Sequence, residues 1–226
     1  MDHIRLIQTE DGSSSLLNIA LNETYHSTHG AIQESTHVFI KNGLQHFIEK
    51  TDLTSASVFE VGFGTGLNAF LALLFSIESK IQIDYTSVEA FPIDWETASR
   101  LNYPQQLKRK EAPVYFQQLH QTEWNKKIRI TDSFSLLKEK SPVQNFEFLS
   151  SQFDIIFFDA FAPSKQPEMW TLFILEKISP ALKTGGVFVT YCAKGQLKRD
   201  LKQLGLMVES LPGPPGKREM VRATKP

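Results

Sequence analysis

Apolar and polar positions alternate along the chain in two patterns. Short apolar runs predict buried β-strands over residues 58–61, 83–88, 128–130, 153–158 and 187–191. Between and after these runs, apolar residues recur with a helical period, which predicts helices over residues 67–76, 95–102, 133–139, 167–178 and 195–204. Strands that alternate with helices are typical of an α/β fold built on a mostly parallel, twisted sheet.

The two ends of the chain follow other patterns. Residues 206–210 and 219–223 predict two strands around a loop rich in Pro and Gly, so we expect the sheet to end in an antiparallel strand. Residues 1–50 combine polar turns with short apolar stretches, which predicts a small β-rich extension with a helix near residues 43–49. We expect this N-terminal extension to form part of the same domain as residues 51–226.

Composition narrows the class of protein. A chain of 226 residues suits one domain, and no apolar run approaches the roughly 20 residues that a membrane span needs. The N-terminus lacks the pattern of a secretion signal, and the single cysteine, Cys192, excludes an internal disulfide, so we expect a cytoplasmic protein. The spacing of the six histidines does not suggest a ligand cluster, so we expect no metal site.

The charge of the chain is unevenly distributed. The whole chain has a formal net charge of −1, which on its own argues against a nucleic-acid-binding protein. Residues 181–226, however, contain nine Lys or Arg residues against three Asp or Glu. This basic segment is either a surface that meets phosphates or an ordinary solvated face.

A glycine-rich turn follows the first predicted strand of the sheet. Gly62, Gly64 and Gly66 allow a ligand to approach the backbone, and the helix that follows offers unpaired N–H groups at its first turn. Together with Glu60, they form an E-x-G-x-G-x-G pattern that resembles the first motif of class I S-adenosylmethionine-dependent methyltransferases. The resemblance implies a Rossmann-like fold and S-adenosyl-L-methionine as the cofactor.

Acidic residues follow three further strands. Glu89 is placed to accept hydrogen bonds from both ribose hydroxyls of the cofactor, since one carboxylate accepts two such bonds. Asp132 either meets the adenine amino group or caps the helix predicted over residues 133–139. Asp159 ends an apolar strand and precedes a loop that is rich in Pro, Lys and aromatic residues, a position typical of a catalytic group in an open α/β sheet.

Four motifs identify a narrower family. They are FGTGLN at residues 63–68, EAFP at residues 89–92, DAFAPSKQPEMWT at residues 159–171 and GKREM at residues 216–220. In this order and spacing they resemble the methyltransferase domain of the bacterial MnmC-type enzymes. This domain also occurs on its own, as a stand-alone MnmD-like form. The resemblance extends from about Tyr25 to the C-terminus.

The resemblance implies methylation of the exocyclic amine of 5-aminomethyl-(2-thio)uridine at wobble position 34 of tRNA. The anticodon region of tRNA is then the partner. Bifunctional members of this family carry a second, flavin-dependent oxidoreductase domain. We expect no such fused domain here, and hence a substrate whose amine is already free.

The family comparison and the residue chemistry together assign roles. The expected cofactor-binding residues are Glu60, Gly62, Phe63, Gly64, Thr65, Gly66, Asn68, Glu89, Asp132 and Asp159. In the expected catalytic group, Asp159 orients the amine and accepts its proton, Phe161 stacks on the uracil or packs in the core, and Pro163 stiffens the loop. The expected substrate- and RNA-binding residues are Tyr25, Lys165, Lys217 and Arg218.

Two other classes of function fit the same fold. One is a methyltransferase that acts on a small molecule, or an aminopropyltransferase that uses decarboxylated S-adenosylmethionine. The other is a non-catalytic RNA-binding module on a degenerate methyltransferase fold. The motif at residues 159–171 argues against the first class, and the intact Glu60, Glu89 and Asp159 argue against the second.

Overall fold

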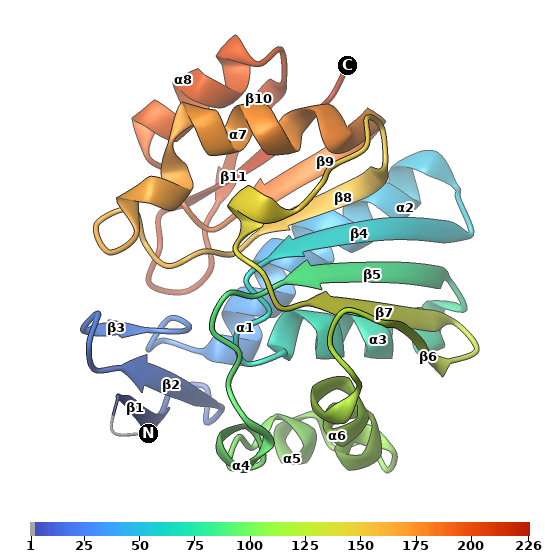
Figure 1. The fold of residues 1–226 in the computed structure, drawn as a ribbon, viewed down its shortest axis with the longest axis vertical. Helices are drawn as coiled ribbons and strands as arrows, with labels where there is room; N and C mark the ends of the chain where they lie inside the picture. Colours follow the sequence, from blue (N-terminus) through green and yellow to red (C-terminus); the bar gives the residue numbers. More distant parts are fainter. Residues whose placement is uncertain (1–2) are drawn as a thin grey trace.

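The computed structural model describes residues 3–226 and contains an eight-stranded sheet with helices on both faces (Figure 1). The strand order is β10-β11-β9-β8-β4-β5-β7-β6. The five inner strands from β9 to β7 are parallel, whereas β6 and β11 pair antiparallel with their inner neighbours. The strands are β4 (Ser55–Val61), β5 (Gln82–Val88), β6 (Lys127–Thr131), β7 (Phe134–Glu139), β8 (Phe153–Phe158), β9 (Leu182–Thr190), β10 (Met207–Pro212) and β11 (Glu219–Thr224).

The helices after the first parallel strand are mostly short. They are α3 (Leu67–Ser79), α4 (Trp95–Ala98), α5 (Tyr103–Leu107), α6 (Ala112–Gln121), α7 (Leu172–Ile178) and α8 (Gly195–Gln203), with single 3-10 turns at η2 (Val143–Asn145), η3 (Pro167–Trp170) and η4 (Ser179–Ala181). Helices α7 and α8 lie in front of and above the sheet in Figure 1, and α3 lies behind it. The mostly parallel sheet therefore has two covered faces, as such sheets require.

Strand β8 shows how the two cores are built. Ile155 and Phe157 pack in the core on the α3 side, whereas Ile156 and Phe158 pack in the core on the α7 side. All six residues of β8 are buried, which is why its sequence is nearly continuously apolar. Its one acid, Asp154, accepts hydrogen bonds from Ser57 N (2.8 Å) and pairs with Lys183 (2.9 Å) at the end of the strand that is opposite Asp159.

The N-terminal residues form a small sheet and a long helical run. The antiparallel strands are β1 (Ile4–Gln8), β2 (Ser14–Asn18) and β3 (Glu23–Thr24), and the helical run consists of α1 (Ala31–Ser35), the π-helix η1 (Thr36–Gln45) and α2 (His46–Thr51). Gly43 lets η1 approach the main sheet closely, since a Cβ atom there would lie 2.9 Å from Val189 Cγ2. The expected β-rich extension is therefore confirmed, and its helix is longer than expected.

Most of the predicted architecture is confirmed. The α/β fold, the mostly parallel sheet and the antiparallel C-terminal strands agree with the sequence patterns, and each of the five predicted strands is present. Within residues 3–226, no helix is both long enough and apolar enough to cross a membrane.

The prediction of a helix over residues 133–139 was wrong. This segment is strand β7, in which Phe134, Leu136 and Lys138 are buried and alternate with less buried residues. An alternation with a period of two belongs to a strand, and a short apolar run allowed the helical interpretation. Strand β6 and β7 form an antiparallel hairpin at this edge of the sheet.

Two predicted helices differ in length from the observed ones. The helix predicted over residues 95–102 ends at Ala98, and α5 and α6, which follow it, were not predicted. The helix predicted over residues 167–178 is divided at Thr171, whose backbone is extended with φ −77° and ψ 153°. Thr171 separates the turn η3 from α7, so residues 159–171 remain a loop beside the carboxyl ends of the strands.

The carboxyl ends of the parallel strands meet at one edge of the sheet. In Figure 1 the arrowheads of β4, β5, β7 and β8 point to this edge, and the N-terminal sheet lies below and in front of it. Strand β11 runs in the opposite direction to β9, so the loop that precedes β11 also arrives at this edge. Ligands of open α/β sheets bind at such an edge.

Candidate active site

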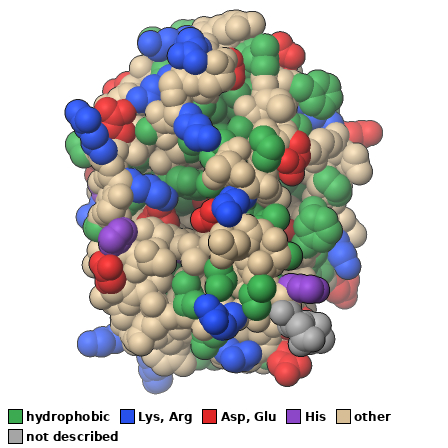
Figure 2. All heavy atoms as spheres, turned by 90° about the vertical axis from the view of Figure 1, so that its left-hand side faces the viewer, with side chains coloured by type: hydrophobic (Ala, Val, Ile, Leu, Met, Phe, Trp, Pro, Cys, Tyr) green, Lys and Arg blue, Asp and Glu red, His purple; other side chains and the backbone are tan. Residues whose placement is uncertain are grey.

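A cavity of about 940 Å³ opens at the carboxyl edge of the sheet. Its wall combines the glycine-rich turn after β4, the ends of β5 and β8, the segment after β7, the N-terminal segment around Tyr25 and the loop before β11. Figure 2 looks onto this side of the molecule, where basic and acidic side chains lie among polar and apolar ones. The residues that line the cavity are far apart in the sequence and range from Asn18 to Lys217.

The glycine-rich turn forms the floor of the cavity beside α3. Gly62 has φ +90°, and a Cβ atom there would lie 2.8 Å from the carbonyl oxygen of Asp159. Gly64 has φ +51°, and a Cβ atom there would lie 3.3 Å from the ring of Tyr25. Both positions need glycine, because positive φ and close contacts disfavour any side chain.

Buried side chains beneath the turn fix Thr65. The hydroxyl of Tyr103 donates to Thr65 Oγ1 at 3.3 Å, and His120 Nε2 lies 3.1 Å from the Thr65 carbonyl oxygen. Burial lowers the pKa of His120 to about 4, so the ring is neutral at pH 7 and its Nε2–H is the donor to the carbonyl. The turn is thus held in place before any ligand binds.

Glu89 ties the end of β5 to the glycine-rich turn. Its Oε2 accepts a hydrogen bond from Gly64 N (2.9 Å), and its Oε1 accepts one from Phe91 N (2.8 Å). Each carboxylate oxygen keeps further acceptor capacity, so the side chain can also bind hydroxyl groups in the cavity.

Asp159 lies in the cavity wall directly after β8. Asn68, in the first turn of α3, donates from Nδ2 to Asp159 Oδ2 at 2.7 Å. Burial and the nearby carboxylate of Glu34 raise the pKa of Asp159 to about 7, while Asn68 and Lys217 favour its charged form. Asp159 is therefore able to exchange a proton near neutral pH.

Glu60 lies beneath Asp159, inside strand β4. Its side chain is fully buried, and Ser87 donates to its Oε2 at 2.7 Å. Burial raises the pKa of Glu60 to about 8. Glu60 supports the floor of the cavity without lining it.

Two aromatic side chains, Tyr25 and Phe161, meet in the cavity wall. The rings of Tyr25 and Phe161 meet edge to face with their centroids 4.9 Å apart. Trp170 Nε1 donates to the carbonyl oxygen of Phe161 at 2.8 Å, which fixes the loop after Asp159. Phe161 therefore faces the cavity, whereas Pro163 lies further along the loop and does not line it.

The four residues expected to contact substrate or RNA lie at different depths. Tyr25 and Lys217 line the cavity, whereas Lys165 and Arg218 lie outside its lining, and Arg218 is exposed. Lys217 forms an ion pair with the buried Glu34. The expected phosphate binding by Lys217 stays a prediction. Its ammonium group is paired with the Glu34 carboxylate, so a phosphate would have to compete with that carboxylate.

Asp132 does not reach the cavity. It lies in the turn between β6 and β7, at the amino end of β7, where its fully exposed side chain pairs with Arg129 at 3.0 Å. The expected adenine contact at Asp132 and its alternative role as a helix cap therefore both fail, because the helix predicted after it is a strand. The segment after the carboxyl end of β7, residues 141–145, lines the cavity instead.

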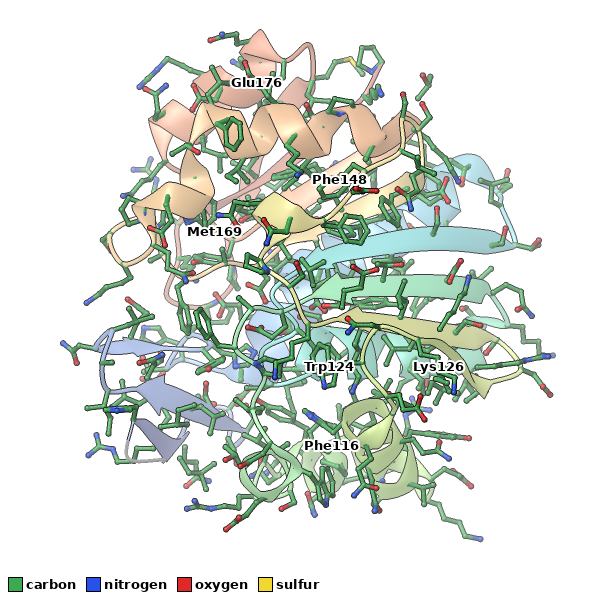
Figure 3. The ribbon with its side chains drawn as sticks, viewed as in Figure 1. Phe116, Trp124, Lys126, Phe148, Met169 and Glu176 are labelled. Carbon is green, nitrogen blue, oxygen red and sulfur yellow. The ribbon has the colours of Figure 1, made fainter. Side chains whose placement is uncertain are left out.

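Several cavity residues were not identified from the sequence. Among them are His26, Glu34, Tyr191 and Met169, together with residues 141–145. Met169, from η3, lies at the left of the sheet in Figure 3, near the carboxyl edge, whereas Phe116 and Trp124 lie below the sheet. No local sequence signal pointed clearly to residues 141–145, because residues 134–139 fit a helix or a strand, and it is their pairing with β5 that makes β7 a strand ending at the cavity.

The cavity fits a nucleoside-containing cofactor. Helix α3 begins with N–H groups that have no partner within the helix, and Asn68 Oδ1 is buried without a hydrogen-bond partner. The N–H groups of the first turn can bind a polar or anionic group of a ligand. Asn68 Oδ1 has no access to the cavity and lies beside the buried carboxyl group of Glu60. Among residues 3–226, no group of three or more His, Cys, Asp or Glu side chains is arranged to hold a metal ion.

Comparisons with known proteins place this geometry in context. Two curated relatives are each called tRNA 5-methylaminomethyl-2-thiouridine biosynthesis bifunctional protein MnmC. The relative from Nitrosospira multiformis is 27% identical over 95% of this chain and 36% of its own length. The relative from a Marinomonas species is 32% identical over 88% of this chain and 30% of its own length. The chain thus spans about a third of the length of these relatives.

A solved structure covers nearly the whole chain. The crystal structure of MNMC2 from Aquifex aeolicus matches with a TM-score of 0.79 and 26% sequence identity, over 99% of this chain and 71% of that chain. A family model described as S-adenosyl-L-methionine-dependent methyltransferase matches residues 101–226, more than half of the chain. By this match, the chain belongs to the family of S-adenosyl-L-methionine-dependent methyltransferases.

Proposed function

We propose that the protein methylates the exocyclic amine of 5-aminomethyl-(2-thio)uridine at wobble position 34 of tRNA. The proposal rests on the position and pKa of Asp159. Its carboxyl group has a pKa of about 7 and lies between the glycine-rich turn and the rings of Tyr25 and Phe161. The names of the relatives from Nitrosospira and Marinomonas supply the nucleoside. Action on tRNA in the cytoplasm is part of the same proposal.

The cofactor half of the cavity is assigned to S-adenosyl-L-methionine. The turn from Gly62 to Gly66 would lie against the methionine part, with Asn68 beside it, and Glu89 would accept hydrogen bonds from the ribose hydroxyls. When bound, this cofactor supplies an electrophilic methyl group on a sulfonium sulfur. Residues 141–145 would border the adenine, because they follow the strand next to β5.

The acceptor half must present an uncharged amine. An alkylammonium group has a pKa of roughly 9 to 10, so most of the free amine is protonated at pH 7. The Asp159 carboxylate can hydrogen-bond the amine, direct its lone pair and accept the proton that the amine loses. Tyr25 and Phe161 can enclose a uracil that has left the anticodon stack.

The N-terminal extension belongs to the proposed catalytic domain. We assign residues 1–50 to the same domain as residues 51–226, the methyltransferase part. Two contacts support this assignment, the close packing of Gly43 on β9 and the ion pair between Glu34 and Lys217. The extension would then supply Tyr25 to the acceptor side.

Contacts with the rest of the tRNA are assigned to basic residues near the cavity. Lys165 and Arg218 come from loops at the carboxyl edge and lack an ion-pair partner among the described residues. Four other basic residues of the C-terminal segment are already paired with carboxylates, namely Lys183 with Asp154, Lys198 with Glu219, Lys217 with Glu34 and Arg222 with Glu209. Charge that is not paired is the charge available to phosphates.

Removal of the Glu89 carboxylate should weaken cofactor binding. The variant Glu89→Ala loses the expected ribose contacts and the support of Gly64, so we expect a loss of about 1.5 to 3 kcal/mol, or roughly a 10- to 150-fold increase in Kd. Calorimetric titration with S-adenosylhomocysteine measures this change. Asp132→Ala is the matched control and should bind like the parent, and a parent-like Kd for Glu89→Ala would exclude the role.

Removal of the Asp159 charge should abolish most of the activity. Methylation of tRNA that carries a free 5-aminomethyl group should fall by roughly 10² to 10⁴ in kcat for Asp159→Asn, with cofactor affinity nearly unchanged. In the parent, the single-turnover rate should rise with pH through about 7, because the carboxylate form of Asp159 increases in that direction. Nucleoside analysis of the product tRNA identifies the methylated base.

Asp154→Asn is the control for that experiment. This acid lies at the other end of β8 and pairs with Lys183, so its replacement should lower the midpoint of thermal unfolding but leave turnover per folded molecule unchanged. Parent-like turnover by folded Asp159→Asn would refute the proposed chemistry. Absence of any methylation of this tRNA by the parent protein would refute the proposed substrate.

Loss of the unpaired basic residues should weaken RNA binding alone. The double variant of Lys165→Ala and Arg218→Ala should raise the KM for tRNA and reduce the slope of its salt dependence by about one unit per lost phosphate contact, without changing cofactor affinity. Lys50→Ala removes an exposed charge from the end of α2 and serves as the control. Equal salt slopes for the double variant and the parent would place the RNA surface elsewhere.

A further inference from the structure

Lys217 connects three parts of the cavity wall. Its ammonium group pairs with Glu34 of α1 and lies 3.9 Å from the centroid of the Tyr191 ring. The Tyr191 hydroxyl donates in turn to the carbonyl oxygen of Ala160 at 2.8 Å, directly beside Asp159. All five residues line the same cavity.

Glu34 is held on both of its oxygens. Its Oε2 accepts a hydrogen bond from Ser27 N at 2.7 Å, and its Oε1 is the partner of Lys217. The Glu34 side chain is 7% exposed, whereas the Lys217 side chain is 31% exposed. A buried carboxylate of this kind needs its cation, because removal of one partner leaves an uncompensated charge.

The loop that carries Lys217 is fixed against the N-terminal segment. His37 Nε2 lies 2.8 Å from the carbonyl oxygen of Pro212, and a Cβ atom at Gly216 would overlap the ring of His29. The packing of the loop therefore brings the Lys217 ammonium group to Glu34. The next residue, Arg218, is exposed and has no such partner among the described residues.

We propose that Lys217 and Glu34 form a positioning pair that orients the turn at Asp159 through Tyr191 and sets the charge that Asp159 carries when it meets the amine. This inference rests on the proposed function, in which Asp159 accepts the proton. Lys217 is then part of the acceptor site and does not primarily bind phosphate.

Charges from every neighbouring element act on Asp159. Lys217 favours its carboxylate form, and Glu34 opposes that form more strongly than Lys217 favours it, so loss of either member changes the pKa of Asp159. The remaining titratable groups that face it are Glu60 of β4, Tyr85 of β5 and Tyr191 after β9. His26 lies near the pair, but burial lowers its pKa to about 4, so it is neutral at pH 7.

Carbon-13 NMR of the Asp159 carboxyl tests the inference without tRNA. The protein is labelled at aspartate, the Asp159 signal is assigned by its loss in Asp159→Asn, and its titration midpoint is measured. Lys217→Met should raise the midpoint by roughly half a pH unit to one unit, and Glu34→Gln should lower it. Lys217→Arg should restore the parent value, and Arg218→Met is the matched control that should leave it unchanged.

Two results would overturn the inference. An unchanged midpoint in folded Lys217→Met would do so, and so would an unchanged midpoint in folded Glu34→Gln, which keeps an acceptor for Ser27 N and therefore the local fold. In methylation assays, the rise in rate with pH should move to higher pH for Lys217→Met. If the midpoints shift as expected but the parent does not methylate the tRNA, the substrate proposal fails and the electrostatic role of the pair stands.

Discussion

The geometry of the cavity depends on the hydrogen bond from Asn68 to Asp159. This bond joins the half that is assigned to the cofactor to the half that contains the acid. Asn68 lies in the first turn of α3, just after the glycine-rich turn, and Asp159 follows β8, the neighbour of β4 in the sheet. The bond can form only because two parallel strands end side by side, at Val61 and Phe158. The position assigned to the cofactor and the position of the acid are thus fixed relative to each other by the sheet itself.

The surroundings of Asp159 explain why an aspartate can act near neutral pH. A fully hydrated aspartate has a pKa near 4 and would be a weak proton acceptor at pH 7. Burial and the carboxylate of Glu34 raise the pKa of Asp159 to about 7. The N-terminal extension therefore contributes both Tyr25 to the cavity wall and, at Glu34, a charge that acts on Asp159.

Much of this arrangement was readable from the sequence. The Gly62 to Gly66 turn, Glu89 and Asp159 follow buried strands, and parallel strands bring their carboxyl ends together. The resemblance of four short motifs to one family gave the same cofactor that the matching family model describes.

The parts that were missed depend on contacts between distant segments. Glu34 is in the cavity because α1 packs against the loop before β11, a contact between residues 183 positions apart that no local pattern encodes. Asp132 was misplaced because the short run at residues 134–139 fits a helix or a strand, and only pairing with β5 decides between them. The basic charge at Lys217 predicted a phosphate contact, since the sequence does not show that a buried acid is its partner.

A structure of the protein with S-adenosylhomocysteine and an anticodon stem-loop that carries 5-aminomethyluridine would test the central claim most directly. We predict that the uracil is flipped out between Tyr25 and Phe161, with its amine nitrogen within hydrogen-bond distance of the Asp159 carboxylate and the sulfur of the cofactor product beyond the nitrogen. An amine that points away from Asp159, or a nucleoside bound outside this cavity, would contradict the account.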